Sequence, residues 1–416
     1  MPEFIPPEPN PLILSAVKAI MPLVLNGEKL DVRPSEHCLA LIRSQKDIPA
    51  VIAVNHIDRC DPAVTATLSL KCKEDYYYLA ARELFDENHG VRGWLMKNAG
   101  VYSVIRGQPE DTESRDKTIA LIAEGKQKLV MFPEGDVTGR DDLVMPLKRD
   151  GIRNMFEAQK LCLEMDPNRE VHIIPTAIYY EVADNALQPL KKCLAELELY
   201  LGLITWNGSL EARIQRVLDS MIRQLEEHYG APSNDSKSPN GRITTLCRYI
   251  VTSVANVTGS QSLEQPSMHT FLYSVRGKLQ RLRSSMIDSE GRFDDYLRAE
   301  TLEKLEVCSK DLDRVQHLLI LATTLHQKPA SLDVLWRVID RMEQIILGKV
   351  SSKGDRIAWI DAAPPISLLR RSRDYDAQPA NAIERTERRL RSSMQQVLEQ
   401  LKNKSEVRHK PALTAA

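Results

Sequence analysis

The 416-residue chain has almost no net charge, few aromatic residues and no long apolar run. Its 56 Lys and Arg residues balance 57 Asp and Glu residues, so the overall charge gives no reason to expect a nucleic-acid partner. No apolar stretch reaches the roughly 18 residues that a membrane-spanning helix needs. The 7 cysteines are irregularly spaced, with no CxxC pair and no secretory leader, which predicts reduced thiols and a cytoplasmic location.

The most membrane-like segment is the apolar run 12–25, within an N-terminal region at 1–29. Ser15, Lys18 and Pro22 interrupt the run at three- and four-residue spacing, so they share one face of a predicted helix. The remaining helix surface is apolar. The pattern is compatible with a helix lying in a membrane interface and equally with a helix packed on the protein core.

Residues 30–230 alternate short apolar runs with amphipathic segments, a pattern typical of α/β units. Predicted strands occupy residues 51–54, 76–80, 101–105, 129–132, 171–174 and 197–201. Predicted helices occupy residues 63–72, 91–97, 114–123, 151–165 and 210–228. This part of the chain is therefore expected to form an α/β domain.

The chain after this domain has a different composition. Residues 231–241 are rich in Pro, Ser, Asn and Gly, which predicts a linker. Residues 242–405 show helical spacing of apolar residues and almost no strand signal, so we expect an all-α domain. Its last apolar stripe, at residues 383–401, is compatible with a bundle or a short coiled coil. Residues 406–416 are predicted to be a disordered tail.

Residues 51–62 contain the most informative strand-to-helix turn. The apolar run 51–54 predicts a buried strand, and His56 follows its end. Asp61 and Pro62 then open a helix, with Asp61 expected at the N-cap and Pro62 at the first helical position. The carboxyl edge of an α/β sheet is where ligands usually bind. His56 beside a carboxylate is therefore a candidate general base.

Further stretches end strands or begin helices with residues suited to a substrate site. These are 100–106, which closes on Arg106; 132–135, with Glu134 and Gly135; 145–151, with Lys148; and 173–178, an apolar run interrupted by Pro175. A His–Asp pair beside Arg and Lys suits proton abstraction from a hydroxyl on a phosphate-bearing substrate.

In these stretches the chain resembles the glycerolipid acyltransferase family, the glycerol-3-phosphate and 1-acylglycerol-3-phosphate acyltransferases. The family's NHxxxxD block is similar to Asn55-His-Ile-Asp-Arg-Cys-Asp61, and its FPEG block to residues 132–135. Its Gly-aromatic-apolar run ending in Arg resembles 100–106, and its Pro-containing strand resembles 173–178. The resemblance covers roughly residues 30–228. It implies a mixed sheet flanked by helices, here followed by the all-α C-terminal domain.

The resemblance also implies a reaction. His56 would be the general base, oriented by Asp61, and would deprotonate a hydroxyl of a glycerol phosphate or lysophospholipid. That hydroxyl would attack the thioester of acyl-CoA or acyl-carrier protein directly, with no further cofactor and no metal. Arg106, helped by Lys148, would bind the substrate phosphate. Glu134 and Gly135 would shape the glycerol site, and Pro175 the wall near the acyl chain.

Membrane-bound acceptors would place the protein peripherally at the cytoplasmic face of a membrane. Two features depart from the family pattern. Asp58 replaces a small polar residue, and Val137 stands where a cation is expected after FPEG. Either Arg140 substitutes for that cation or phosphate recognition is weaker. A metal-dependent hydrolase using His56, Asp58, Asp61 and Glu134 is an alternative, as is a catalytically idle lipid-binding scaffold.

Other reactive or charged residues fit simpler roles. Cys60 lies four positions after His56, but a packed small side chain explains it better than a nucleophile does. Basic clusters lie in the C-terminal half, at Arg276, Lys278, Arg281 and Arg283; at Arg370, Arg371 and Arg373; and at Arg385, Arg388, Arg389 and Arg391. Solvated helix faces account for such runs, and adsorption to anionic lipid headgroups is the alternative.

Overall fold

The computed structural model describes residues 4–86, 90–105, 112–204, 206–233, 238–260, 267–287, 295–326 and 331–409. The described chain divides into two compact units. Residues 4–104, 112–183 and 355–409 form a unit built around a sheet, and residues 184–354 form a helical unit. The candidate site lies wholly within the sheet unit.

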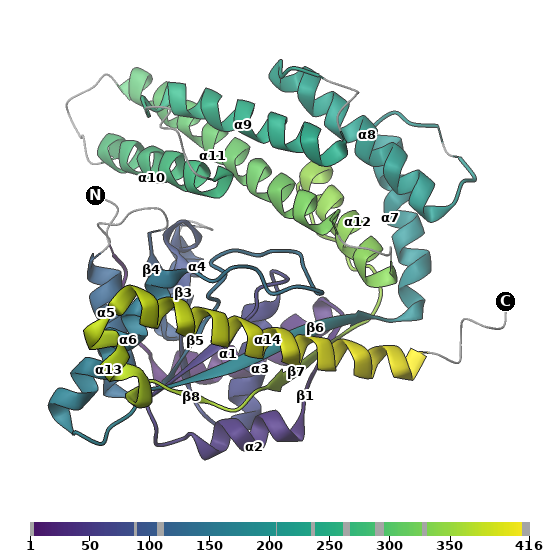
Figure 1. The fold of residues 1–416 in the computed structure, drawn as a ribbon. Helices are drawn as coiled ribbons and strands as arrows, with labels where there is room; N and C mark the ends of the chain where they lie inside the picture. The colour runs from purple at the N-terminus through teal and green to yellow at the C-terminus, as the bar shows by residue number, and fades with distance from the viewer. Residues whose placement is uncertain are drawn as a thin grey trace. The chain divides into compact units, whose positions relative to one another are not determined.

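One mixed sheet forms the centre of the sheet unit (Figure 1). Its strands are β1 (Leu30–Pro34), β2 (Ala50–Val54), β3 (Tyr76–Ala81), β4 (Val101–Val104), β5 (Lys128–Met131), β6 (His172–Val182), β7 (Arg356–Ala362) and β8 (Ile366–Ser367). The strand order is β1-β7-β6-β2-β5-β3-β4, with β8 beside β6. Strand β6 is antiparallel to β7 and β8, and the other neighbours are parallel. The continuous apolar sequence of β2 is buried along its whole length, as expected for a central parallel strand.

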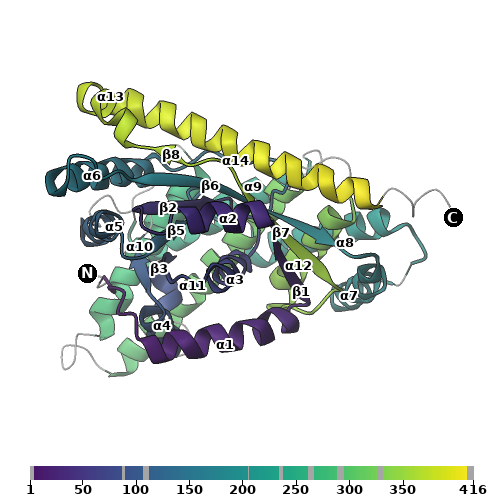
Figure 2. The same cartoon turned by 90° about the horizontal axis from the view of Figure 1, so that it is seen from below.

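Helices cover both faces of this sheet, as Figure 2 shows. They are α1 (Pro11–Gly27), α2 (Glu36–Ser44), α3 (Asp61–Cys72), α4 (Val91–Asn98), α5 (Thr112–Glu124), α6 (Arg149–Met165), α13 (Ser372–Ala377) and α14 (Pro379–His409). Ile52 and Val54 belong to the core beneath α2 and α3. Val51 and Ala53 belong to the core on the other face, with α6 and α14. Successive side chains of β2 point to opposite faces of the sheet, so the strand contributes to two separate hydrophobic cores.

The helical unit contains α7 (Leu187–Tyr200), α8 (Leu210–Tyr229), α9 (Pro239–Val257), α10 (Met268–Ile287), α11 (Asp295–Thr324) and α12 (Leu332–Leu347). In Figure 1, α9, α10 and α11 lie side by side. Lys353 is fully buried between Asp340 and Glu343, at 2.7 and 2.5 Å. A buried charge of this kind is tolerated only when it is paired, so these contacts bind the segment after α12 to the unit.

The helical unit is inserted in the sequence between two neighbouring strands. Strand β6 ends at Val182, and β7 returns beside it from Arg356. The amide of Ala183 donates to the carbonyl of Asp355 at 2.9 Å, so the two ends of the insertion are adjacent. Such an arrangement allows a large insertion without breaking the sheet, because the ends of the inserted segment are close together.

The predicted fold class is confirmed: a mixed sheet with flanking helices is accompanied by a helical region. Three details differ. Residues 197–201, predicted as a strand, lie at the end of α7, where Leu194 and Leu197 follow helical spacing into the core. Residues 356–367, expected within an all-α stretch of 242–405, include β7 and β8. The apolar stripe 383–401 packs against the sheet core rather than in a bundle.

The boundaries of the two units also differ from the expected ones. The Pro- and Ser-rich segment 231–241 joins α8 to α9 inside the helical unit, and the chain changes unit near residues 183 and 355. The predicted tail begins within α14, and residues 410–416 lie outside the described part of the chain. Composition therefore marked a loop between two helices of one unit, not the junction between the units.

The N-terminal apolar run forms α1, whose N-cap is Asn10. The Asn10 carboxamide oxygen accepts from the amides of Leu12 and Ile13 at 3.0 and 3.3 Å. None of the helices in the described ranges is long and apolar enough to cross a bilayer.

Candidate active site

The turn between β2 and α3 places the candidate site at the carboxyl edge of the sheet. Asn55 is buried at the end of β2, and its carboxamide pairs with the backbone of Ile178 on β6, at 3.1 Å to the carbonyl and 2.8 Å from the amide. The Asn55 side chain thereby extends the hydrogen bonding between β2 and β6 by one residue beyond the end of β2. This contact fixes the direction in which the chain leaves β2 and presents His56.

Asp61 has a different role from the predicted N-cap. The first helical turn of α3 has no side-chain cap, and Cys60 is at the N-cap position. Asp61 is fully buried, and its Oδ2 accepts the amides of Ile57 and Asp58 at 2.7 and 2.9 Å. The carboxylate thus closes the turn on which His56 stands.

His56 and Asp61 form a hydrogen-bonded pair. His56 Nδ1 lies 2.8 Å from Asp61 Oδ2, while Tyr180 donates its hydroxyl proton to Asp61 Oδ1 at 2.6 Å. A carboxylate at Nδ1 favours the tautomer that carries its proton there. Nε2 is then an acceptor, and it makes no hydrogen bond within the described part of the chain. The side chain of His56 is 17% exposed, so this nitrogen belongs to a group that a substrate can reach.

Burial dominates the electrostatics of this pair. Desolvation raises the pKa of the Asp61 carboxyl, and hydrogen bonds from His56 and Tyr180 oppose that rise. Desolvation and the neighbouring Asp61 charge raise the pKa of Tyr180 well above its usual range, so the phenol keeps its proton and remains a donor. Asp61 therefore has a hydrogen-bond donor on each oxygen, as a group that orients a histidine requires.

The FPEG segment follows β5, the parallel neighbour of β2, so it reaches the same sheet edge. The Phe132 ring stacks on His56, with centroids 4.4 Å apart and an interplanar angle of 24°. Glu134 is buried, and its two oxygens accept the amides of His56 at 2.7 Å and Met145 at 2.9 Å. Burial raises the pKa of Glu134 to about 7, against the lowering effect of these amides. Glu134 thus connects the His56 turn to the segment before α6.

Gly135 and Lys148 are in contact with each other. Gly135 has φ +82°, and a Cβ placed there would lie 2.8 Å from Cε of Lys148. The Lys148 amide donates to the Pro133 carbonyl at 2.7 Å, which holds the lysine over the FPEG turn. The Lys148 side chain is exposed, and its ammonium has no ion-pair partner among the described residues. The charged Lys148 side chain therefore lies beside the FPEG turn of the candidate site.

The segment after FPEG packs against the catalytic turn through Thr138. Its amide and hydroxyl both donate to the carbonyl of His56, at 2.7 and 2.9 Å. Arg140, the expected substitute for a cation at Val137, forms a two-pronged ion pair with Asp142 at 2.6 and 2.8 Å. Its guanidinium is already occupied by that carboxylate.

Asp58, which departs from the family pattern, pairs with a residue nearly 300 positions away in the sequence. Its Oδ2 lies 3.2 Å from Nη1 of Arg356, the first residue of β7. Burial raises the pKa of Asp58, but the nearby Arg356 and Arg59 charges outweigh it and hold that pKa well below its usual range. Arg356 also lies over the Tyr180 ring, 5.4 Å from its centroid. The pair links the catalytic turn to the strand that returns from the helical unit.

The remaining predicted residues are placed differently. Pro175 is buried within β6 opposite Ala53, where β6 exchanges its neighbour β8 for β7. A proline is tolerated at this gap because no partner needs its missing amide, and its carbonyl accepts from Ala363 at 2.8 Å. Arg106 lies outside the described residues, so its phosphate role stays a prediction.

Tyr180 and Arg356 are site residues that sequence reasoning missed, and Asn55 belongs to the NHxxxxD block but had no predicted role. Tyr180 lies on β6, two residues beyond the predicted Pro-containing run 173–178, and nothing local shows which β6 side chain meets Asp61. Cys60 is buried, and burial raises the pKa of its thiol well above the usual range, as a packed side chain would show. Among the described residues, no three His, Cys, Asp or Glu side chains are grouped to hold a metal ion.

Comparison with known proteins agrees with this geometry. Residues 36–179 match the protein family described as Acyltransferase, a range that includes His56, Asp61, Glu134, Gly135 and Lys148. A comparison with curated proteins finds no match for the chain. The matched range covers β2 to most of β6, the part of the sheet that carries the site. Residues 36–179 therefore form an acyltransferase-family domain, which supports the resemblance to the glycerolipid acyltransferases.

Proposed function

We propose that the protein transfers a fatty acyl group from the thioester of acyl-CoA or acyl-carrier protein to a hydroxyl of a glycerol phosphate or lysophospholipid. The observation that carries this proposal is the His56–Asp61 pair, with Nδ1 bound to the carboxylate and Nε2 left to accept a proton. A base of this kind contributes on the order of 10²–10⁴-fold to a proton-transfer step.

In the proposed reaction, His56 Nε2 takes the proton of the acceptor hydroxyl as the oxygen attacks the thioester carbonyl. The new C–O bond gives a tetrahedral intermediate, whose collapse breaks the C–S bond and expels the thiolate. The thiolate takes the proton from His56, which returns the base to its neutral state. Asp61 stabilises the transient imidazolium, and the Tyr180 hydroxyl and two backbone amides keep Asp61 in position.

Glu134 acts in this proposal by positioning the catalytic turn. Both of its oxygens accept backbone amides, one of them the amide of His56 itself, so a direct bond to the acceptor would compete with these contacts. Lys148 is the described cation best suited to an acceptor phosphate, because its ammonium has no ion-pair partner in the described ranges and it packs over Gly135. Arg106 is the second proposed phosphate ligand.

A membrane surface is the proposed location of the acceptor. Helix α1 exposes Leu12 at 82% and Leu23 at 70%, and the nearby α4 exposes Trp94 at 56%. Lys97 of α4 pairs with Glu8 just before α1, so the two apolar surfaces are held together. Exposed apolar side chains on a helix, with an aromatic residue among them, suit insertion into a lipid interface. We therefore propose peripheral binding at the cytoplasmic face of a membrane.

An acceptor panel tests the reaction. The full chain is incubated with labelled acyl-CoA and, separately, glycerol 3-phosphate, lysophosphatidate and lysophosphatidylcholine, and the products are separated by chromatography. Labelled ester with a phosphate-bearing acceptor, together with an equal release of thiol, is the expected result. Thiol release without ester indicates hydrolysis, and the absence of both, with acyl-CoA and with acyl-carrier protein, contradicts the proposal.

The membrane location has its own test. The full chain and a Leu12→Ser/Leu23→Ser variant are compared for co-sedimentation with phosphatidylcholine vesicles, with Leu199→Ser as a control for an exposed leucine of the helical unit. We expect the double variant to lose most of its binding and the control to keep it. Equal binding by all three proteins would remove α1 as the contact surface.

A further inference from the structure

A basic pocket lies at the opposite edge of the sheet from His56. It has a volume of about 490 Å³ and is lined by Gln45, Glu170, His172, Pro365, Ile366, Ser367, Arg370, Arg371, Asp374 and Arg389. His172 begins β6 and pairs with Ala50 at the start of β2, whereas His56 follows the end of β2. Six residues of extended chain span about 20 Å, so this pocket is separate from the proposed acyl-transfer site.

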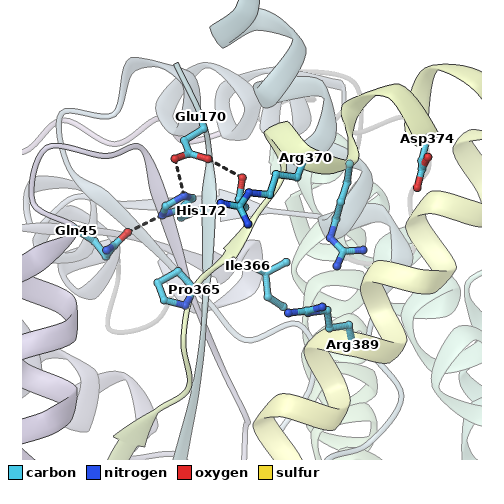
Figure 3. Close-up of a pocket in the computed structure, with 10 residues that line it drawn as sticks. Gln45, Glu170, His172, Pro365, Ile366, Arg370, Asp374 and Arg389 are labelled. Atoms are coloured by element: carbon cyan, nitrogen blue, oxygen red, sulfur yellow. Dashed lines mark hydrogen bonds and ion pairs between the residues drawn. The ribbon is translucent and has the colours of Figure 1, made fainter. Parts of the chain in front are cut away.

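The neutral and acidic groups of the pocket are already paired with one another. His172 Nδ1 contacts Gln45 Oε1 at 2.5 Å, and Nε2 contacts Glu170 at 3.1 Å. The Ser367 hydroxyl donates to the other Glu170 oxygen at 2.6 Å. Figure 3 shows this chain of contacts on one wall, with Arg370 beside Glu170 and Arg389 reaching in from α14. These groups hold the pocket wall, and the charge of the nearby Arg370 helps to lower the pKa of Glu170.

The three pocket arginines are the donors that remain. None of the guanidinium groups of Arg370, Arg371 and Arg389 makes a hydrogen bond or an ion pair with another residue in the described part of the chain. Burial lowers the pKa of Arg371, and the nearby positive charge of Arg389 lowers it further. Asp374, which also lines the pocket, offsets part of this lowering. The guanidinium groups of Arg371 and Arg389 nevertheless repel each other, which costs electrostatic free energy.

Nearby arginines outside the pocket differ from the pocket arginines because they have hydrogen-bond or ion-pair partners. On the same helix, Arg391 donates to the Val144 carbonyl at 2.8 Å, and Arg388 pairs with Glu384 at 3.3 Å. Arg385 lies 3.8 Å from Asp374, the second acid of the pocket, in an exposed ion pair. These arginines have acceptors of their own. Arg370 and Arg389, which are exposed, and the half-buried Arg371 instead line one cavity without a hydrogen-bond or ion-pair partner in the described ranges.

We propose that this pocket binds a phosphate monoester group, carried by a soluble metabolite or by a lipid headgroup. A guanidinium presents paired N–H donors that match the oxygens of a phosphate, and a tetrahedral dianion has enough oxygens to accept from several of them at once. Such a group neutralises the repulsion between Arg371 and Arg389. The three arginines come from the segment that returns after the helical unit: Arg370 and Arg371 from the short helical turn after β8, and Arg389 from α14.

Calorimetric titration of the full chain with inorganic phosphate tests the site. We expect Arg371→Gln/Arg389→Gln to weaken this binding at least tenfold and to reduce its dependence on salt. Arg388→Gln is the control, since it removes one positive charge from α14, the helix that carries Arg389, outside the pocket, and it should bind phosphate as the unaltered protein does. Arg370→Gln serves as a second variant if the double one does not fold, with the same tenfold weakening expected.

Vesicles distinguish the two sources of the phosphate group. Phosphatidate vesicles carry a phosphate monoester and phosphatidylcholine vesicles do not. Stronger binding to phosphatidate that the double variant loses points to a lipid headgroup, whereas binding of inorganic phosphate alone points to a soluble ligand. Phosphate binding that the pocket variants leave unchanged, or no binding of either probe by the unaltered protein, overturns the proposal.

Discussion

The buried ion pair between Asp58 and Arg356 gives a sharp prediction about how the catalytic turn is held. The side chains are 5% and 2% exposed, and their charged atoms are 3.2 Å apart. Replacing Asp58 by Asn removes the carboxylate charge beside the buried Arg356 guanidinium, and such a loss costs about 3–5 kcal/mol of unfolding free energy. Arg356→Met should cost a similar amount by stranding the Asp58 carboxylate. The double variant should recover about 1–3 kcal/mol relative to the sum of the single changes.

The assay is urea unfolding of the four proteins, combined with amide hydrogen exchange of the β7 peptide. Exchange in β7 reports the sheet unit directly, so it separates this effect from unfolding of the helical unit. Arg385→Gln is the control, because its ion pair with Asp374 is 3.8 Å long with both side chains 62% exposed, and its loss should change stability by less than about 0.5 kcal/mol. Single variants as stable as the control, or strictly additive effects, would refute the idea that Asp58 anchors β7.

Three further predictions concern the residues around the base. Tyr180→Phe leaves Asp61 Oδ1 without its side-chain donor and should cost about 1–3 kcal/mol in urea unfolding; no loss would mean that the hydrogen bond is not needed. The pKa of Glu134 is raised from 4.5 to about 7, so the folded state binds this proton more tightly than the unfolded state does. The unfolding free energy should therefore fall as the pH rises between those two values. The decrease amounts to about 3 kcal/mol, and Glu134→Gln should abolish it; a pH profile that the substitution does not alter would assign the effect elsewhere. Gly135→Ala should destabilise the fold by roughly 1–2 kcal/mol, because the alanine would have φ +82° and its Cβ would contact Lys148. The melting temperature should therefore fall, and an unchanged value would show that the turn relaxes.

Local sequence signals were sufficient for the part of the fold that carries the site. The apolar run 51–54 and the Asp61-Pro62 start predicted β2 and α3 to within one or two residues. Because β2 and β5 are parallel neighbours, the residues that follow them meet at one edge, and the sequence placed His56 and Glu134 together for that reason. Strand-end chemistry of this kind depends on short-range patterns, so it can be read without a structure.

Contacts between distant segments could not be predicted in the same way. Strand β7 begins with a charged residue, Arg356, whose burial makes sense only beside Asp58. Its antiparallel partner, β6, is separated from it by the whole helical unit, and no local pattern records that pairing. The N-cap prediction for Asp61 failed for a related reason. Its carboxylate is used by His56, Tyr180 and the turn amides, contacts that outweigh the cap of a single helix.

The central claim is that His56 is the base of an acyl transfer. The most direct test is the single-turnover rate of ester formation from labelled acyl-CoA for the unaltered chain and for His56→Gln, with His228→Gln, an exposed histidine of the helical unit, as the control. The account predicts a loss on the order of 10²–10⁴-fold for His56→Gln. Its melting temperature should stay close to that of the unaltered chain, and the control should stay fully active. A His56→Gln protein that forms ester at the unaltered rate would contradict the account.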